Sequence, residues 1–132
     1  IRSNWCNEFL YVSGYKLNDE RRHVLTWLGG VEPPTHPHGG HVWEIASIPG
    51  TGNFTITSVW AKELMYCGGP TLNAQRRHVL TWEGGAEPPT SPPGGHIWQI
   101  SPVSGSDLFT IISTWQDEFM YVGGPKLTDE RR

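Results

Sequence analysis

The chain has 132 residues, enough for one hydrophobic core, and a single domain over residues 1–132 is expected. Its formal net charge is −3 and its ten lysines and arginines form no continuous basic tract, which argues against a nucleic-acid binder. No apolar run approaches the roughly 18 residues of a membrane span, so we expect none.

In chain order, each part of the sequence returns after 55 residues without a gap. Trp5, Trp60 and Trp115 stand at this interval, and Arg21–Trp27 returns unchanged as Arg76–Trp82. Self-similarity at a fixed period indicates a repeat architecture. The repeats are repeat 1 at 1–53, repeat 2 at 54–108 and partial repeat 3 at 109–132.

Short segments rich in β-branched and aromatic residues alternate with clusters of Gly, Pro, Asn or Asp. Period-two alternation places Phe54, Ile56 and Trp60 on one face, and helical spacing is absent. The sequence therefore predicts an all-β protein. The predicted strands are 1–5, 9–12, 23–27, 41–45, 54–60, 64–67, 78–82, 96–100, 109–115 and 119–122.

Four strands per repeat favour a β-trefoil with pseudo-threefold symmetry, in which two strands per repeat close a barrel and two form a capping hairpin. The 55-residue interval is long for this fold, and the excess lies in a Pro/Gly-rich loop at 28–40 that recurs at 83–95. The third repeat is truncated at Arg132, before its last hairpin. We expect the natural chain to continue by roughly one hairpin, or to have been clipped after Arg132.

The order of the motifs resembles the ricin-type β-trefoil lectins, whose repeat carries Leu-x-Val, then Val-x-x-Trp, then Gln-x-Trp-x-Ile. Leu10–Val12, Val24–Trp27 and His41–Ile45 follow that order, as do their equivalents in repeat 2. The resemblance implies a non-catalytic carbohydrate-binding module whose partners are glycans or glycoproteins.

This chain departs from the family at the residues that bind sugar. The Asp that such lectins place inside Leu-x-Val is Tyr11 here, and Tyr66 and Tyr121 in the other repeats. The Asn before Gln-x-Trp is Gly40 or Gly95. A tyrosine lacks the paired acceptors of a carboxylate, so the usual galactose site is not expected.

Trp27 and Trp82 are the leading candidates for ligand contact. Each precedes a Pro-rich loop, and an exposed indole suits the apolar face of a sugar ring. Glu32 and Glu87 repeat in that loop within Glu-Pro-Pro, where a stiff carboxylate would accept hydrogen bonds from hydroxyls. The alternatives are an indole packed beneath its loop prolines and a solvated loop charge.

Asn18 and Asn73 are candidate amide ligands, with turn formation before an arginine pair as the alternative. His41 and His96 replace the Gln of Gln-x-Trp. We expect each to tie a hairpin to a backbone carbonyl, with pH-dependent binding as the alternative. The remaining tryptophans are predicted core residues: Trp5, Trp43, Trp60, Trp98 and Trp115.

No metal, cofactor or enzymatic activity is predicted. Of the three histidines at 36–41, only His41 is retained in the copy at 91–96, and no nucleophile–base pair or phosphate loop is present. Cys6 and Cys67 are not repeat equivalents, and either two buried thiols or a bridge is compatible with their positions. Asn53 begins an N-glycosylation sequon.

The leading hypothesis is a lectin-like module with up to three similar sites and without nucleic-acid partners. A homo-oligomer is compatible with it, and secretion is favoured although the sequence does not identify the compartment. One alternative is a protein-binding trefoil, such as a protease inhibitor or the receptor-binding domain of a toxin. Another is a structural or storage protein whose repetition reflects duplication alone.

Overall fold

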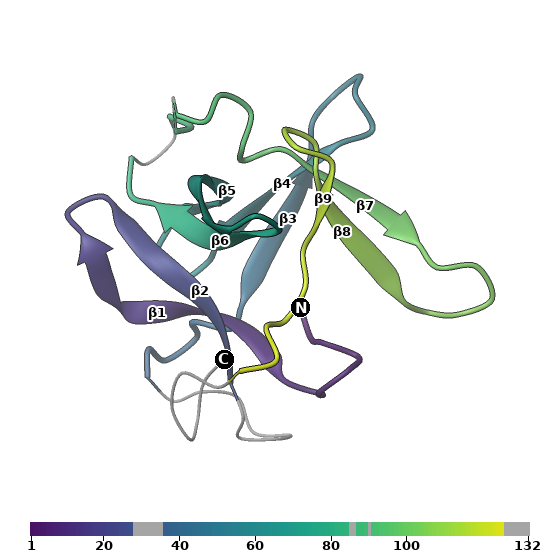
Figure 1. The fold of residues 1–132 in the computed structure, drawn as a ribbon, viewed down its shortest axis with the longest axis horizontal. Coiled ribbons are helices and arrows are strands. Elements are labelled where there is room, and N and C mark those ends of the chain that lie inside the picture. The colour runs from purple at the N-terminus through teal and green to yellow at the C-terminus, as the bar shows by residue number, and fades with distance from the viewer. Residues whose placement is uncertain (28–35, 85–86, 90, 126–132) are drawn as a thin grey trace.

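The computed structural model describes residues 1–27, 36–84, 87–89 and 91–125, and over these ranges the protein is all-β, without helices, as predicted. Nine antiparallel strands of this described part form one sheet in the order β1-β2-β6-β5-β4-β7-β8-β9, with β3 paired to β4 (Figure 1). They are β1 Phe9–Asn18, β2 Arg21–Trp27, β3 Trp43–Ser47, β4 Phe54–Ser58, β5 Leu64–Asn73, β6 Arg76–Trp82, β7 Trp98–Pro102, β8 Phe109–Ser113 and β9 Glu118–Phe119.

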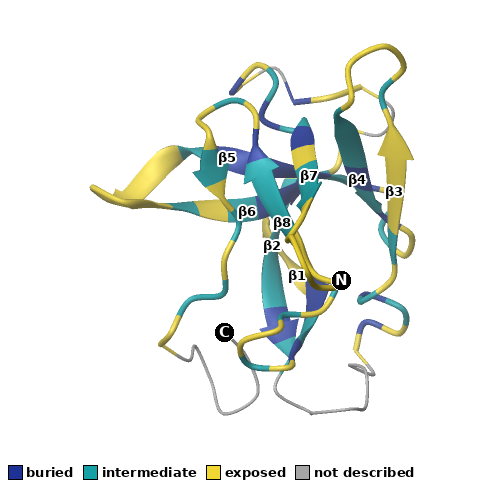
Figure 2. Cartoon of the chain, turned by 90° about the vertical axis from the view of Figure 1, so that its right-hand side faces the viewer, coloured by how far each residue is buried: buried dark blue, intermediate teal, exposed yellow. Residues whose placement is uncertain are grey.

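Equivalent hairpins of the first two repeats have the same register. Phe9 pairs with Trp27 in the β1–β2 hairpin, and Leu64 pairs with Trp82 in the β5–β6 hairpin. The β1–β2 and β7–β8 hairpins leave the centre of the molecule on opposite sides (Figure 1). The outer ends of β5 and β6 are exposed, whereas their inner ends are buried (Figure 2).

The backbone repeats as well as the sequence does. Asn7, Lys62 and Asp117 have φ angles of 60°, 59° and 59°, a region that residues other than glycine seldom adopt. Each of their amides donates a hydrogen bond of 2.9 Å to the carbonyl four residues earlier, on a serine. The same turn therefore precedes β1, β5 and β9, one in each repeat.

The structure corrects the predicted role of several tryptophans. Trp5 and Trp60 are 68% and 40% exposed, so the prediction that they belong to the core is wrong. Because β4 ends at Ser58, Trp60 lies in the following turn, where the Arg22 guanidinium lies 5.3 Å from its ring centroid. The predicted first strand at 1–5 is also absent, since only Arg2 forms an isolated bridge, to Phe9.

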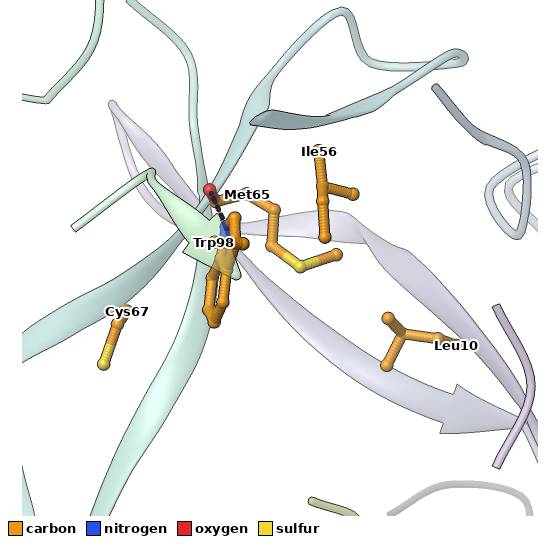
Figure 3. Packing of buried hydrophobic residues seen from close by; sticks show 5 residues of the cluster. All are labelled: Leu10, Ile56, Met65, Cys67 and Trp98. Carbon is orange, nitrogen blue, oxygen red and sulfur yellow. Dashed lines mark hydrogen bonds between the residues drawn. The ribbon is translucent and has the colours of Figure 1, made fainter. Parts of the chain in front are cut away.

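The core is built from equivalent positions of successive repeats. The buried cluster draws on β1, β4, β5 and β7, and Trp43, Trp115 and other partly buried residues pack around it. The indole of Trp98 donates a hydrogen bond of 3.1 Å to the Met65 carbonyl (Figure 3). Its equivalent Trp43 donates to Leu10 at 2.9 Å. The members of the buried cluster are Leu10, Ile56, Met65, Cys67 and Trp98.

A buried carboxylate links the first two repeats. The side chain of Glu63 is 3% exposed and accepts a hydrogen bond from the hydroxyl of Thr81 in its own repeat. It also accepts one of 2.9 Å from Nε of Arg22, in the preceding repeat. Glu118 accepts the equivalent hydrogen bond of 3.1 Å from Arg77, so the inter-repeat ion pair occurs twice.

We predict that Glu63→Ala lowers the free energy of unfolding by about 3 kcal/mol, because it leaves the largely buried Arg22 without its partner. Glu118→Ala should lower it by about 1 kcal/mol or less, since that side chain is 38% exposed and its ion pair is screened by solvent. Urea unfolding monitored by circular dichroism measures both. Glu44→Ala, at an exposed position of β3, is the control. Equal losses for Glu63 and Glu118 would contradict this account.

Candidate functional site

Trp27 and Trp82 occupy the same position at the ends of β2 and β6, and both are half-buried. The ring of Trp82 meets that of Tyr66 nearly at right angles, with centroids 6.3 Å apart, and Trp27 meets Tyr11 in the same way at 6.1 Å. Trp82 pairs with Leu64, and Tyr66 lies two residues farther along the same strand, so the sheet places both rings on one face. The indole position is therefore set by the strand register.

Residues of the first repeat surround Trp82. Arg21 pairs with Trp82 where β2 meets β6, which brings the tip of the β1–β2 hairpin beside the indole. The amide of Glu83 donates a hydrogen bond of 2.8 Å to the Glu20 carbonyl, and the ammonium of Lys16 lies 2.5 Å from the Glu83 carboxylate. We define the Trp82 site as Lys16, Asn18, Glu20 and Arg21 from repeat 1 with Tyr66, Trp82, Glu83, Gly84 and Glu87 from repeat 2.

Gly84 lies close against the indole of Trp82. A Cβ atom on Gly84 would lie 2.1 Å from the indole Nε1, so only glycine fits there without moving the ring. The amide of Glu87 approaches the Gly84 carbonyl at 3.4 Å, and the Glu87 side chain is exposed. Glu32, the counterpart predicted for the first repeat, lies outside the described residues.

The structure separates the two asparagines from the tryptophans of their own repeats. Asn18 accepts a hydrogen bond of 3.0 Å from the Glu20 amide, and Asn73 accepts one of 2.9 Å from the Gln75 amide, so each forms the turn that was the alternative. Because β6 spans seven residues, Asn73 lies roughly 20 Å from Trp82. Asn18 lies nearer to Trp82, two strands away, because Arg21 pairs with both residues. The sequence pattern groups residues within one repeat, so it does not predict this pairing between strands of different repeats.

His41 and His96 do not tie a hairpin to a carbonyl, and that prediction is wrong. Nδ1 of each ring is buried without a hydrogen-bond partner, and the neighbouring indoles of Trp43 and Trp98 donate to the carbonyls instead. Because the indole is larger than the imidazole, it reaches the backbone carbonyl of the adjacent strand. His41 packs edge-on against Phe9 with a centroid distance of 5.5 Å.

Burial lowers the pKa values of these imidazoles. Desolvation lowers the pKa of His96 from its ordinary value. It also lowers the pKa of His41, where the charges of the N-terminus and His38 act in the same direction. In the β2–β6 region, burial lowers the pKa of His23, and His78, whose ring centroid is 5.0 Å away, lowers it further.

Packing accounts for the departures from the lectin pattern. Tyr11 and Tyr66 are each 1% exposed, so the position that carries the sugar-binding Asp in such lectins is buried in these repeats. Burial raises the pKa of Tyr66, and the nearby guanidinium of Arg21 acts in the opposite direction. A Cβ atom on Gly95 would lie 2.8 Å from Cγ of Pro92, which leaves no room for an asparagine there, and Gly40 faces Pro37 in the same way at 2.7 Å.

Neither cysteine is part of a disulfide, and burial raises the pKa of the Cys67 thiol. Within the described ranges, no three His, Cys, Asp or Glu side chains lie together as a metal site would require. The same ranges hold no helix long and apolar enough to cross a membrane. Comparison with protein-family models, with curated proteins and with solved structures finds no match.

Because the pKa values of His23, His41 and His96 are lowered on folding, the unfolded chain binds protons more readily than the folded chain. We predict that the free energy of unfolding is highest above the ordinary histidine pKa of 6.5 and falls as the pH drops through that value toward the folded pKa values. Urea unfolding measured between pH 8 and 5, in steps of about half a pH unit, gives the slope of the free energy of unfolding against pH.

His96→Gln should flatten the slope because it removes one of the three histidines whose pKa is lowered on folding. Gln99→Ala, at an exposed position nearby, removes none and is the control. A wild-type slope unchanged by His96→Gln would contradict the assignment.

Proposed function

We propose that this protein is a non-catalytic carbohydrate-binding module that binds glycans or glycoproteins at the Trp82 site. The observation that carries the proposal is the half-buried indole of Trp82, held by Tyr66 and bordered by charged side chains from two repeats. An aromatic ring beside convergent polar groups is the arrangement that recognises the apolar face and the hydroxyls of a sugar ring.

The polar groups of the site supply both partners that a hydroxyl needs. Lys16 donates, whereas the carboxylates of Glu83 and Glu87 accept. Lys16 and Glu83 form an exposed ion pair, with about two fifths of each side chain accessible. Such a pair contributes about 0–1 kcal/mol, so sharing it with a sugar hydroxyl costs little. The site therefore combines stacking with adaptable hydrogen bonds.

We also propose that the all-β sheet belongs to a β-trefoil. Support comes from the turn repeated at Asn7, Lys62 and Asp117 and from the identical registers of the β1–β2 and β5–β6 hairpins. The equivalent positions of Trp27 and Trp82 would then offer two indoles on one rigid body, of which Trp82 has the hairpin of another repeat beside it. Two weak sites bind a multivalent glycan with avidity, and a homo-oligomer would multiply that effect.

We predict that Trp82→Ala weakens glycan binding by roughly fivefold to tenfold, the loss expected for one aromatic contact of about 1 kcal/mol. A glycan array identifies the ligand, and isothermal titration calorimetry with that ligand measures the change. Trp5→Ala removes an exposed indole outside the site and is the matched control. Equal affinities for the two variants, or no glycan bound by the wild type, would sink the proposal.

Gly84→Ala should weaken binding without removing any side chain of the site. The added methyl group would collide with the indole and displace it from Tyr66. The near-ultraviolet circular dichroism of the aromatic side chains should change together with the affinity. Gly50→Ala adds a methyl group in open space at another turn and controls for glycine replacement, although its φ of +75° also strains the backbone.

A further inference from the structure

Two histidines at equivalent sequence positions meet where the first two repeats join. His23 of β2 and His78 of β6 stand one repeat interval apart in the sequence, and their ring centroids are 5.0 Å apart with the ring planes at 62°. By contrast, His41 packs against Phe9 of its own repeat. The contact between His23 and His78 therefore forms only when β2 of the first repeat lies beside β6 of the second.

The strand register places both imidazoles on one face of the sheet. His23 pairs directly with Leu80, and His78 lies two residues before Leu80 on the same strand. Because alternate residues of a strand point to the same face, His78 shares the face of Leu80 and hence of His23. The two histidines are diagonal neighbours across the β2–β6 pair, close enough for ring side chains to touch.

The separation of the two rings is the one that a shared metal ion requires. Zinc binds imidazole nitrogens at about 2.0–2.1 Å in a tetrahedral arrangement. Two imidazoles that bind one such ion have ring centroids roughly 5 Å apart. His23 and His78 already have a centroid separation of 5.0 Å. The strand pairing thus holds two potential ligands at chelating distance without a bound ion.

The ring nitrogens of the pair are free to bind. Within the described part of the chain, no hydrogen bond holds the side chain of His23 or His78. A neutral imidazole carries one acceptor nitrogen, and this is the atom that binds a metal ion. His78 is exposed and His23 is half-buried, so the pair is open to solvent on one side.

The arginines next to these histidines in the sequence are turned to the opposite face of the sheet. Each binds a carboxylate, which offsets its positive charge. These pairs are Arg22 with Glu63 and Arg77 with Glu118.

Two further arginines share the face of the histidines. The Arg21 guanidinium lies beside Tyr66. Arg76 is exposed, so solvent and salt screen its repulsion of a bound cation. Burial lowers the pKa of His23, and His78 lowers it further. Both causes favour the neutral form of the imidazole, which is the form that binds a metal ion.

The spacing of histidines along the chain points to a different place. His36, His38 and His41 lie within six residues, yet they do not gather as a metal site within the described ranges. Pro37 is buried between them, and Nδ1 of His41 is buried where that ring packs against Phe9. The tertiary structure instead brings together two histidines that are distant in the sequence.

We propose that His23 and His78 form a binding site for a divalent transition-metal ion of the class that prefers imidazole, with Zn²⁺ as the representative. The ion would link β2 to β6 and hence the first repeat to the second. Two side chains are fewer than the three or four of a permanently occupied zinc site, so water completes the coordination and the ion exchanges with solution. The proposal is independent of sugar binding, since neither histidine belongs to the Trp82 site.

A titration of the 132-residue protein with zinc chloride near neutral pH tests the proposal. Isothermal titration calorimetry should show saturable binding of one ion per protein. Nuclear magnetic resonance of the imidazole groups identifies the ligands, and the ring signals of His23 and His78 should shift together as Zn²⁺ is added.

His78→Gln should weaken Zn²⁺ binding by about tenfold or more, because it removes one of two ligands at an exposed position where the fold tolerates the change. Circular dichroism checks that the fold is retained. His38→Gln removes an exposed histidine outside the pair and is the matched control, with unchanged affinity expected. Saturating Zn²⁺ should raise the urea midpoint of the wild type but not that of His78→Gln, since the ion binds the folded pair.

The proposal is wrong if the wild type binds no Zn²⁺ or if His78→Gln leaves the affinity unchanged. A loss of binding in His38→Gln, or shifts confined to the ring signals of the histidines at 36–41, would place the ion there and overturn the assignment to the β2–β6 pair.

Discussion

The buried carboxylate of Glu63 is the interaction on which the joining of the first two repeats depends. A charge with 3% of its side chain exposed is tolerated only with hydrogen-bonding partners, and these come from Thr81 in the same repeat and Arg22 in the preceding one. The Arg22 guanidinium also donates a hydrogen bond of 2.8 Å to the Gly14 carbonyl and lies over the ring of Trp60. The Arg22 side chain thereby contacts the β1–β2 hairpin, the turn after β4 and Glu63 of the second repeat.

That arrangement has a consequence for binding, because it makes the Trp82 site a property of two repeats. The hairpin tip that carries Lys16, Asn18 and Arg21 reaches Trp82 only because β2 pairs with β6. A single repeat would present an indole without the charged side chains beside it. The pairing of β2 with β6 therefore joins the two repeats and also places side chains of both beside Trp82.

Much of the fold followed from local pattern. The hairpins formed by β1 with β2 and by β5 with β6 lie where alternating β-branched and aromatic residues predicted strands, and the turns lie at the polar clusters. The error at Trp60 comes from the extension of a local pattern past the end of its strand. Trp60 continues the alternation of Phe54 and Ile56 in sequence, yet the chain has already turned after Ser58. Likewise, the comparison of His41 with a glutamine ignored the indole of Trp43, which reaches the carbonyl of Leu10.

By itself, the sequence determined the all-β class, the 55-residue interval and the choice of Trp27 and Trp82 as equivalent residues, because strand alternation and repetition are properties of neighbouring positions. Only the tertiary structure decided which residues stand beside those tryptophans. Asn18 accompanies Trp82, 64 positions away, and Asn73 of the same repeat does not. The physical reason is that β2 pairs with β6 and Arg22 binds the buried Glu63, both of which are interactions between distant segments that no local pattern contains.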